Sequence, residues 1–252
     1  ERGERTFVAI SEPSGGADPA RAIQTRAELK GDRYVVNGTK LWITSAKDSR
    51  WGVLFARTDK AAGRGGVTAF VIEKDWPGLS MSEVPVIRSY YPYELHFEDF
   101  EIPVENRLGG EGEGFKLAEE WLVHGRMPYA AGTVGIAQAA LDLATEWARD
   151  RETFGSLLAD KQATQWMLAD SEIELRASRA LIYQAAAKAD RGENAKIDAS
   201  VCKVYATETA GRVVDRCIQI FGGLGVSQEL PLERWYRELR IKRIGEGPSE
   251  VH

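Results

Sequence analysis

The chain has 252 residues, of which 43% are hydrophobic and 28% are charged, as is ordinary for a globular protein of one large domain or two smaller ones. Its net charge of −5 argues against a general affinity for nucleic acid, which requires a basic surface. The sequence has no apolar run long enough to span a membrane, no signal peptide in its charged first residues and no metal-ligand spacing among its three histidines.

The first hundred or so residues predict β structure. Hairpin turns are expected at Gly31-Asp32 and at Asn37-Gly38, because two-residue hairpin turns need positive φ angles. A further turn is expected over Asp75–Gly78. Short β-rich runs lie at Thr6–Ser11, Leu29–Tyr34, Tyr34–Leu41, Trp51–Arg57, Val67–Glu73 and Leu95–Ile102. Several short strands with frequent turns favour a small barrel or sandwich.

A glycine-rich stretch, Arg107–Gly114, marks the expected domain boundary, with a β domain over residues 1–112 and a helical domain over residues 113–252. Four amphipathic segments follow, at about residues 115–149, 161–191, 195–221 and from Pro231 onward. Short links between long helices are typical of a four-helix bundle. The expected fold class is therefore α+β and multi-domain, with an antiparallel β-barrel or sandwich followed by an up-down four-helix bundle.

The two cysteines, Cys202 and Cys217, both fall in the third predicted helix. Their spacing corresponds to roughly 22 Å along a helix axis, which is too far for a disulfide within the chain. Isolated cysteines of this kind indicate core packing and a reducing compartment.

The C-terminal stretch predicts a carboxylate on a tight corner. Glu246 stands between Gly245 and Gly247, whose missing side chains allow a ligand to approach the backbone. Pro248 suits the first turn of a helix or the bend leading into one. The alternative interpretation is an ordinary loop with a solvated glutamate, since a motif match is only a hypothesis.

A second candidate feature is Trp42 and Thr44, near the end of a predicted strand. Residues two apart project to the same face of a strand. An aromatic ring beside a hydroxyl suits a flat heteroaromatic ligand, with Trp42 packing beside the ring and Thr44 bonding its polar edge. The alternative is a core tryptophan beside a surface threonine. The loop that contains Ser11 is, by itself, only a turn rich in proline and glycine.

These stretches resemble, in order, motifs of the acyl-CoA dehydrogenase family. Residues 246–251 are similar to the family's Glu-Gly-x-Ser-Glu-Val signature, whose first carboxylate is the catalytic base. Residues 37–44 resemble Asn-Gly-x-Lys-x-Trp-Ile-Thr, and residues 11–18 resemble Thr-Glu-Pro-x-x-Gly-Ser-Asp. The resemblance implies that Glu246 is the base, that Gly247 binds substrate, and that Ser11, Trp42 and Thr44 contact the flavin ring of FAD.

The sequence departs from the family pattern at three positions within or next to these motifs. Ala17 replaces a usual serine that helps hold the CoA phosphates, Gly245 replaces a frequent aromatic, and Pro248 replaces a usual threonine. The Gly-Pro-Ser-Glu-Val-His form is similar to a subgroup that includes a bifunctional long-chain type. The sequence alone does not convert these departures into a substrate.

The helical half resembles the family at three more places. Arg151–Gly155 is similar to Arg-x-x-Phe-Gly, which implies that Arg151 and Phe154 contact FAD, with the guanidinium at the pyrophosphate across a subunit interface. Gln162 matches a glutamine that follows this motif in the family, which implies a related role in FAD binding. Residues 219–225 resemble Gln-x-x-Gly-Gly-x-Gly, which implies that the neighbouring subunit's FAD adenosine is contacted by Gln219, Gly222 and Gly223. Without the resemblance, the more common interpretation of Arg151 would be a solvated arginine at the end of a helix.

Arg126 matches an arginine near the catalytic corner, implying a substrate-binding role. Some members of the family take the base from the residue just before this arginine. Here that residue is Gly125, which cannot accept a proton. Glu246 is therefore the only carboxylate at either of the family's two base positions.

The resemblance as a whole implies FAD-dependent α,β-dehydrogenation of an acyl-CoA thioester. Glu246 would remove the α-proton, and hydride would pass to flavin N5. It further implies a homotetramer (a dimer of dimers) and an acceptor such as electron-transfer flavoprotein, in bacterial cytoplasm or a mitochondrial or peroxisomal matrix. The family's N-terminal helical domain has no counterpart in this sequence, which also lacks a starting methionine and is therefore interpreted as a fragment.

Two other classes of function stay open at this point. A related flavoprotein oxidase or monooxygenase would keep the fold and the flavin but change the chemistry. A non-catalytic flavin-binding relative, or a nucleic-acid-binding one, would keep only the fold, although the net charge of −5 disfavours DNA.

Overall fold

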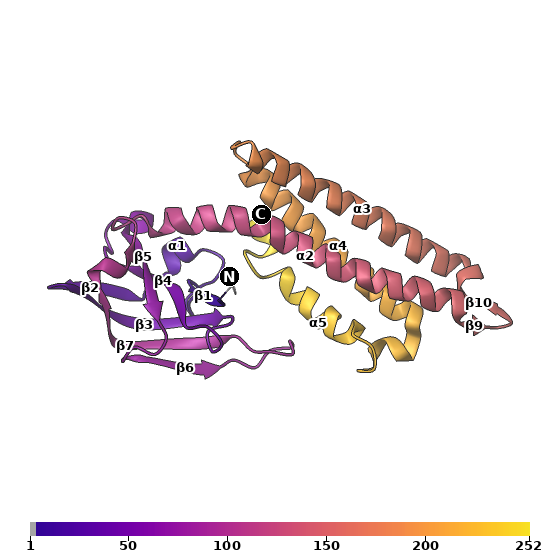
Figure 1. Cartoon of the computed structure of the whole chain (residues 1–252), viewed down its shortest axis with the longest axis horizontal. Helices are drawn as coiled ribbons and strands as arrows, with labels where there is room; N and C mark the ends of the chain where they lie inside the picture. The colour runs from indigo at the N-terminus through magenta and orange to yellow at the C-terminus, as the bar shows by residue number, and fades with distance from the viewer. Residues whose placement is uncertain (1–3) are drawn as a thin grey trace. The chain divides into compact units, whose positions relative to one another are not determined.

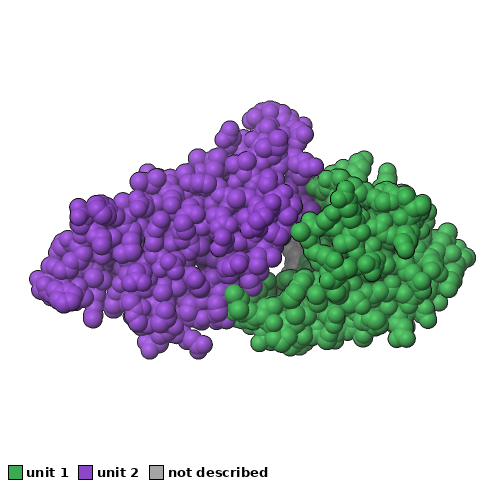
Figure 2. Space-filling view, turned by 180° about the vertical axis from the view of Figure 1, so that it is seen from behind, with its two compact units in different colours: residues 1–120 green, residues 121–252 purple. Residues whose placement is uncertain are grey.

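The computed structural model describes residues 4–252. The chain forms two compact units, the first ending at Glu120 and the second running from Trp121 to His252 (Figure 2). The first unit holds strands β1 to β8, and the second holds four long helices, of which the first begins in the sheet unit (Figure 1).

The sheet unit is built on one eight-stranded sheet with the order β6-β7-β3-β2-β4-β5-β8, in which β1 pairs with β4. Most neighbouring strands are antiparallel, but β1–β4 and β2–β4 pair in parallel, so the sheet is mixed. The strands are β1 Thr6–Ala9, β2 Arg26–Lys30, β3 Arg33–Ile43, β4 Trp51–Arg57, β5 Val67–Glu73, β6 Leu79–Glu83, β7 Tyr93–Pro103 and β8 Arg107–Leu108. Three short helices connect them: α1 Pro19–Ala22, η1 Gly63–Gly66 and η2 Val104–Asn106.

One of the two predicted hairpin turns is confirmed and the other is wrong. Gly31-Asp32 does turn between β2 and β3, where Lys30 pairs with Arg33. Asn37-Gly38 instead lies inside β3, at a shift in its pairing with β7.

The turn prediction is wrong because Asn37 and Gly38 both make contacts within the sheet. The Asn37 side-chain amide donates to Asp99 Oδ1 at 3.1 Å, and its oxygen accepts the Asp99 N–H at 3.0 Å. Gly38 has φ 151°, and a Cβ there would lie 2.5 Å from Thr25 Oγ1. The glycine is therefore required by a close approach within a strand.

The helical unit forms the expected bundle. Its helices are α2 Gly114–Asp150, α3 Gln162–Asp190, α4 Lys196–Phe221 and α5 Leu232–Lys242. Their connections are β9 Glu152–Thr153, β10 Ser156–Leu157, η3 Leu158–Asp160 and η4 Gly222–Val226, and η5 Ser249–Val251 follows α5. These bounds agree closely with the four predicted helices, because the period of their apolar residues is clear over many turns. The predicted α+β class, with a sheet domain followed by a helical domain, is thus confirmed. The sheet is mixed where an antiparallel one was expected, because β1 and β2 each pair with β4 in parallel.

The first turns of α2 pack with the sheet unit. Ala118 is fully buried in a cluster with Phe55 and Val67. This packing explains why the compact units divide after Glu120, within α2 rather than before it. The boundary predicted between residues 112 and 113 stays a prediction.

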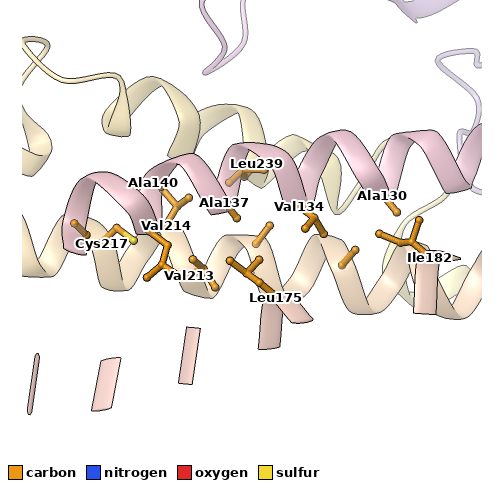
Figure 3. Close-up of a cluster of buried hydrophobic side chains, with 14 of the residues drawn as sticks. Ala130, Val134, Ala137, Ala140, Leu175, Ile182, Val213, Val214, Cys217 and Leu239 are labelled. Carbon is orange, nitrogen blue, oxygen red and sulfur yellow. The ribbon is translucent and has the colours of Figure 1, made fainter. Parts of the chain in front are cut away.

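Small side chains bring the bundle helices together (Figure 3). Ala130, Ala137 and Ala140 of α2 are buried in one cluster with Val213 and Cys217 of α4. Close approach of this kind maximises dispersion contacts between helix backbones.

Both cysteines are free and buried, as predicted. Burial raises the pKa of Cys202 to about 11 and that of Cys217 to about 12, so both thiols are protonated and unreactive at neutral pH. Among residues 4–252, none of the helices has the length and apolar character needed to cross a membrane.

Candidate active site

The helical unit places Glu246 on a tight corner after α5. The corner begins where the Gly245 N–H donates to Ile241 O at 2.9 Å. Glu246 has φ 55° and Gly247 has φ 100°, so two successive residues are left-handed. For a non-glycine residue this conformation costs on the order of 1–3 kcal/mol, and it persists only where the surroundings enforce it.

The Glu246 carboxylate is shielded from solvent, and one of its oxygen atoms is left without a hydrogen-bond partner within residues 4–252. Its Oε2 atom is buried and has no hydrogen-bond partner among the described residues. Burial raises the pKa of Glu246 above the ordinary value, against the opposing charges of Arg126, Lys242 and Lys203. A carboxylate in this state is prepared to take up a proton.

Gly125 of α2 faces this carboxylate directly. A Cβ built on Gly125 would lie 3.4 Å from Glu246 Oε2. The two positions from which the resemblance draws a base therefore point at the same place in the helical unit. Since Gly125 has no side chain, Glu246 has that space to itself.

Three polar residues on one face of α4 hold the segment that carries Glu246. Glu208 lies 2.7 Å from Arg243 Nε and accepts a hydrogen bond from Ser249 Oγ at 2.7 Å. Ser200 Oγ lies 3.0 Å from His252 Nδ1, and Lys203 contacts the main chain of the corner. The corner is thus fixed on both sides of Glu246.

The two residues predicted to bind substrate lie at the corner, against its main chain. Arg126 Nε donates to the carbonyl oxygen of Glu246 at 3.3 Å, and Nη1 lies 3.5 Å from Ser200 Oγ. A Cβ on Gly247 would come within 3.0 Å of His252 Nε2. Gly247 is therefore required both by its positive φ and by the close approach of His252.

The sheet unit presents an exposed aromatic residue where the flavin face was predicted. Trp42 has φ 66° and is 51% exposed, whereas the next residue, Ile43, is buried. Thr44 is again exposed. Ser11 is tied to the same strand, because its carbonyl oxygen accepts the Leu41 N–H at 2.9 Å. Indole ring and hydroxyls thus share one region of the unit.

A fully buried ion pair lies beneath this region. Lys40 Nζ donates to Glu12 Oε1 at 2.7 Å and to Ile10 O at 3.2 Å. The Glu12 carboxylate also accepts the N–H groups of Gln24 at 2.7 Å and Thr25 at 3.1 Å. The pair therefore joins the Ser11 loop, strand β3 and the segment entering β2.

The charges of this pair support each other against the cost of burial. Burial alone would raise the pKa of Glu12, but Lys40 and the hydrogen bonds hold it below the ordinary value. Burial lowers the pKa of Lys40 to about 8, against the opposing effect of Glu12. Both groups are therefore ionised at neutral pH.

The remaining predicted FAD contacts gather at the opposite end of the helical unit. Trp147 near the end of α2 stacks on Phe221 at the end of α4, with 5.2 Å between ring centroids, and the Arg151 guanidinium lies 5.7 Å from the Trp147 ring. This contact unites two motifs that are about seventy residues apart. Exposed at this end are Arg151, Phe154, Gln162, Gln219, Gly222 and Gly223.

The distance between this end and the Glu246 corner is long. Arg126, which contacts the corner, lies in α2, and Arg151 directly follows the last residue of that helix, 25 positions later. At 1.5 Å per residue the separation is roughly 37 Å. Figure 1 shows the β9–β10 hairpin and the C-terminus at opposite ends of the helical unit. In one chain, the corner that carries Glu246 and the group of residues around Arg151 are therefore two separate candidate sites.

The residues present fit FAD as the implied cofactor. Phe154 is fully exposed with φ 53°, so its ring is held out at the tip of the β9–β10 hairpin. Gly222 and Gly223 leave open backbone, since a Cβ at either would meet nothing within 4 Å. An exposed indole with hydroxyls suits a flavin ring, and a guanidinium fork with open backbone suits its phosphates.

Sequence reasoning missed the buried residues that hold both groups in place. Lys203 falls among the apolar-face residues of α4, beside Cys202 and Ala206, and Lys40 shares the inward face of β3 with Tyr34 and Val36. A lysine at an apolar position of a helix or strand is rare unless it is paired. That mismatch was the available signal, and Glu208 had none.

Two family models match this chain. The model for "Acyl-CoA dehydrogenase, middle domain" matches residues 8–100, and the model for "Acyl-CoA dehydrogenase, C-terminal domain" matches residues 112–252. The short-chain specific acyl-CoA dehydrogenase of Clostridium acetobutylicum is 40% identical over 245 residues, which are 96% of this chain and 64% of that protein.

Solved structures show the same similarity. Butyryl-CoA dehydrogenase from Megasphaera elsdenii matches with a TM-score of 0.94 and 38% identity, covering 98% of this chain and 66% of that one. A chain from a structure described as the electron transferring flavoprotein of Acidaminococcus fermentans matches with a TM-score of 0.95 and 40% identity, again over 98% and 66%. This chain thus spans less than two thirds of the length of these relatives.

Proposed function

The chain belongs to the acyl-CoA dehydrogenase family, and from this premise we propose that the protein desaturates an acyl-CoA thioester between its α and β carbons, with Glu246 as the base. The observation that carries the proposal is the Glu246 carboxylate: one oxygen is buried without a partner, on a corner that its neighbours hold in a left-handed conformation. A solvated loop glutamate would show neither property.

The chemistry asked of Glu246 follows from the acidity of the substrate. A C–H bond beside a thioester carbonyl is a weak acid, so the base must have a high proton affinity and yet be ionised before reaction. Burial supplies the first property, and the nearby charges of Arg126 and Lys203 supply the second. Main-chain N–H groups of the corner would stabilise the enolate-like oxygen. FAD, when bound, supplies the acceptor for the hydride that leaves the β carbon.

The cofactor contacts divide between two copies of the chain in this proposal. Ser11, Trp42 and Thr44 would hold the flavin ring. The group around Arg151 lies roughly 37 Å along α2 from the residue that contacts Glu246, so it would serve the FAD of a second copy. This division requires a homo-oligomer, and we propose a dimer of dimers. Electron-transfer flavoprotein is the proposed acceptor, supported by the similarity to the Acidaminococcus chain.

Replacement of Arg151 by alanine is expected to weaken FAD binding about 10- to 100-fold, because a charge-assisted hydrogen bond to phosphate is lost. The measurement is the FAD retained after ultrafiltration at a series of protein concentrations. Arg149→Ala, which removes a neighbouring exposed arginine at the end of α2, is the control and should retain FAD like the wild type. Equal retention by both variants would remove Arg151 from the cofactor site.

The pH dependence of the reductive step should reflect the raised pKa of Glu246. Because the base must be ionised to act, the rate is low below this pKa and rises as the pH passes through it. The acid limb should therefore lie above 4.5, the ordinary pKa of a glutamate. Single-turnover flavin reduction measured across a pH series checks this, and a limb at or below the ordinary value would contradict a desolvated base.

Turnover with an acceptor dye tests the function as a whole. The names of the relatives point to short acyl chains, so butyryl-CoA is the first substrate to test, followed by longer and branched acyl-CoAs. Dye reduction with one class of acyl-CoA is the expected result. A reduced flavin that reacts rapidly with oxygen instead would favour an oxidase or monooxygenase, and no electron transfer with any acyl-CoA would leave the fold without the dehydrogenase activity.

A further inference from the structure

Lys203 is a buried cation whose position among the apolar residues of α4 has no structural explanation in the helix itself. It is fully buried, and its neighbours on the same helix face, Ala199, Cys202 and Ala206, are small or apolar. A buried ammonium is costly unless it is well hydrogen-bonded. Its contacts therefore identify what the charge is for.

The ammonium of Lys203 binds the main chain on both sides of Glu246. Nζ donates to Gly247 O at 2.6 Å and lies 3.5 Å from Arg243 O. The carbonyl oxygen between them, that of Glu246, receives Arg126 Nε at 3.3 Å. Three carbonyl groups of the corner thus converge on two cations, one from α4 and one from α2.

These contacts explain how the corner is held in its left-handed conformation. Glu246 and Gly247 both have positive φ angles. Within the described part of the chain, the Glu246 side chain makes no hydrogen bond through Oε2 that would help to fix this backbone conformation. The orientation of the carboxylate is consequently set by the contacts of Lys203 and Arg126 with the main chain of the corner. An error of about 1 Å in the position of such a group can cost about 10²-fold in rate.

We propose that Lys203 is the positioning residue for Glu246: its buried ammonium fixes the corner through the carbonyl groups of Arg243 and Gly247. This inference rests on the proposed function. Burial lowers the pKa of Lys203 to about 8, with Arg126 lowering it further and Glu246, Glu208 and Glu250 opposing. The side chain therefore remains a cation at neutral pH.

The groups that face Lys203 come from three segments and set the sign of its effect. Arg126 belongs to α2 and Glu208 to α4. Segment 242–252, comprising the end of α5 and the residues after it, contributes Glu246, Glu250 and His252. The same segment contributes Lys242, whose charge acts on Glu246. Among these charges, removal of one cation beside Glu246 favours the protonated carboxyl group. The pKa of Glu246 should then rise, and the acid limb of the reductive step should move to higher pH.

The test compares Lys203→Met, which removes both charge and hydrogen bonds, with Lys203→Gln, which keeps an N–H donor without the charge. Both should shift the acid limb upward. The methionine variant should also lose about 10²-fold in the limiting rate of flavin reduction, with a smaller loss in the glutamine variant and little change in substrate affinity for either. Lys196→Met, at an exposed position on the same helix, is the control and should behave as wild type.

The outcomes separate this inference from the proposed function. No flavin reduction by acyl-CoA in the wild type would contradict the proposed function itself. Normal reduction in the wild type together with an unchanged limb and rate in Lys203→Met would overturn the positioning role alone. If the methionine variant does not fold, Lys203→Gln decides by the same two readouts. Failure of both variants to fold would assign Lys203 to stability and reject the positioning role.

Discussion

Glu246→Gln is expected to reduce the rate of flavin reduction by acyl-CoA about 10²- to 10⁴-fold, because this is the range that a positioned general base contributes. The amide has nearly the shape of the carboxyl group, so the corner should be preserved. Arg126 and Lys203 bind the main chain of the corner and not the Glu246 side chain. The variant should therefore bind FAD normally and fail in the proton transfer alone.

A matched control makes this expectation specific. Glu105→Gln makes the same chemical change at an exposed carboxylate in η2 and should leave the rate unchanged. Gly125→Glu in a Glu246→Gly background tests the site from the other side, since a Cβ on Gly125 would lie 3.4 Å from Glu246 Oε2. Partial recovery of the rate is expected there. Near-wild-type turnover by Glu246→Gln would remove Glu246 as the base.

Lys40→Met should destabilise the protein by about 3–5 kcal/mol, the usual cost of removing one partner from a buried ion pair. The Glu12 carboxylate would remain buried with its main-chain donors but without its counter-ion. Because the pair joins the Ser11 loop to β3, flavin retention should fall together with stability. Denaturant unfolding of the FAD-bound protein and of the FAD-free protein measures both effects.

Two variants isolate the cause. Lys47→Met disrupts an exposed pair, in which Lys47 Nζ lies 3.5 Å from Glu83 Oε1, and should cost about 1 kcal/mol or less. Glu12→Gln added to Lys40→Met removes the orphaned charge and should recover part of the loss. Equal stability of Lys40→Met and Lys47→Met would show that the buried pair has no special role in the sheet unit.

The pH dependence of stability follows from the lowered pKa of Glu12. A carboxyl group whose folded pKa lies below its unfolded value contributes stability that is present above the unfolded value, here 4.5, and is lost as the pH falls through the folded value. The contribution of the pair should therefore disappear below the ordinary glutamate range. In Lys40→Met this acid-dependent loss should be absent.

The fold was largely predictable because its signals are local and repeated. The helices show a 3.6-residue apolar period over many turns, and strands such as β4 and β5 are bounded by clear turn residues. The wrong hairpin at Asn37-Gly38 shows the limit of that reasoning. The dipeptide has the composition of a turn, but its side-chain and backbone requirements are met by Asp99 and Thr25, which are distant in the sequence.

Candidate site residues could be proposed from the sequence where the side chain itself would carry the chemistry. Glu246, Trp42 and Arg151 are identified by motifs, and the structure places them on a corner, on an exposed strand end and at a helix end. The residues that hold them could not be assigned in this way. Lys203 and Glu208 act through contacts with residues about forty positions away, which only the packing of α4 against the C-terminal segment creates.

Whether Glu246 takes the α-proton of an acyl-CoA can be tested by anaerobic rapid mixing. The FAD-bound protein is mixed with butyryl-CoA and with longer acyl-CoAs, and the visible flavin absorbance is recorded for the wild type and for Glu246→Gln. We expect rapid bleaching in the wild type, and bleaching slowed by at least about 10²-fold in the variant, with equal flavin content. Equal bleaching rates in the two proteins would contradict this role of Glu246.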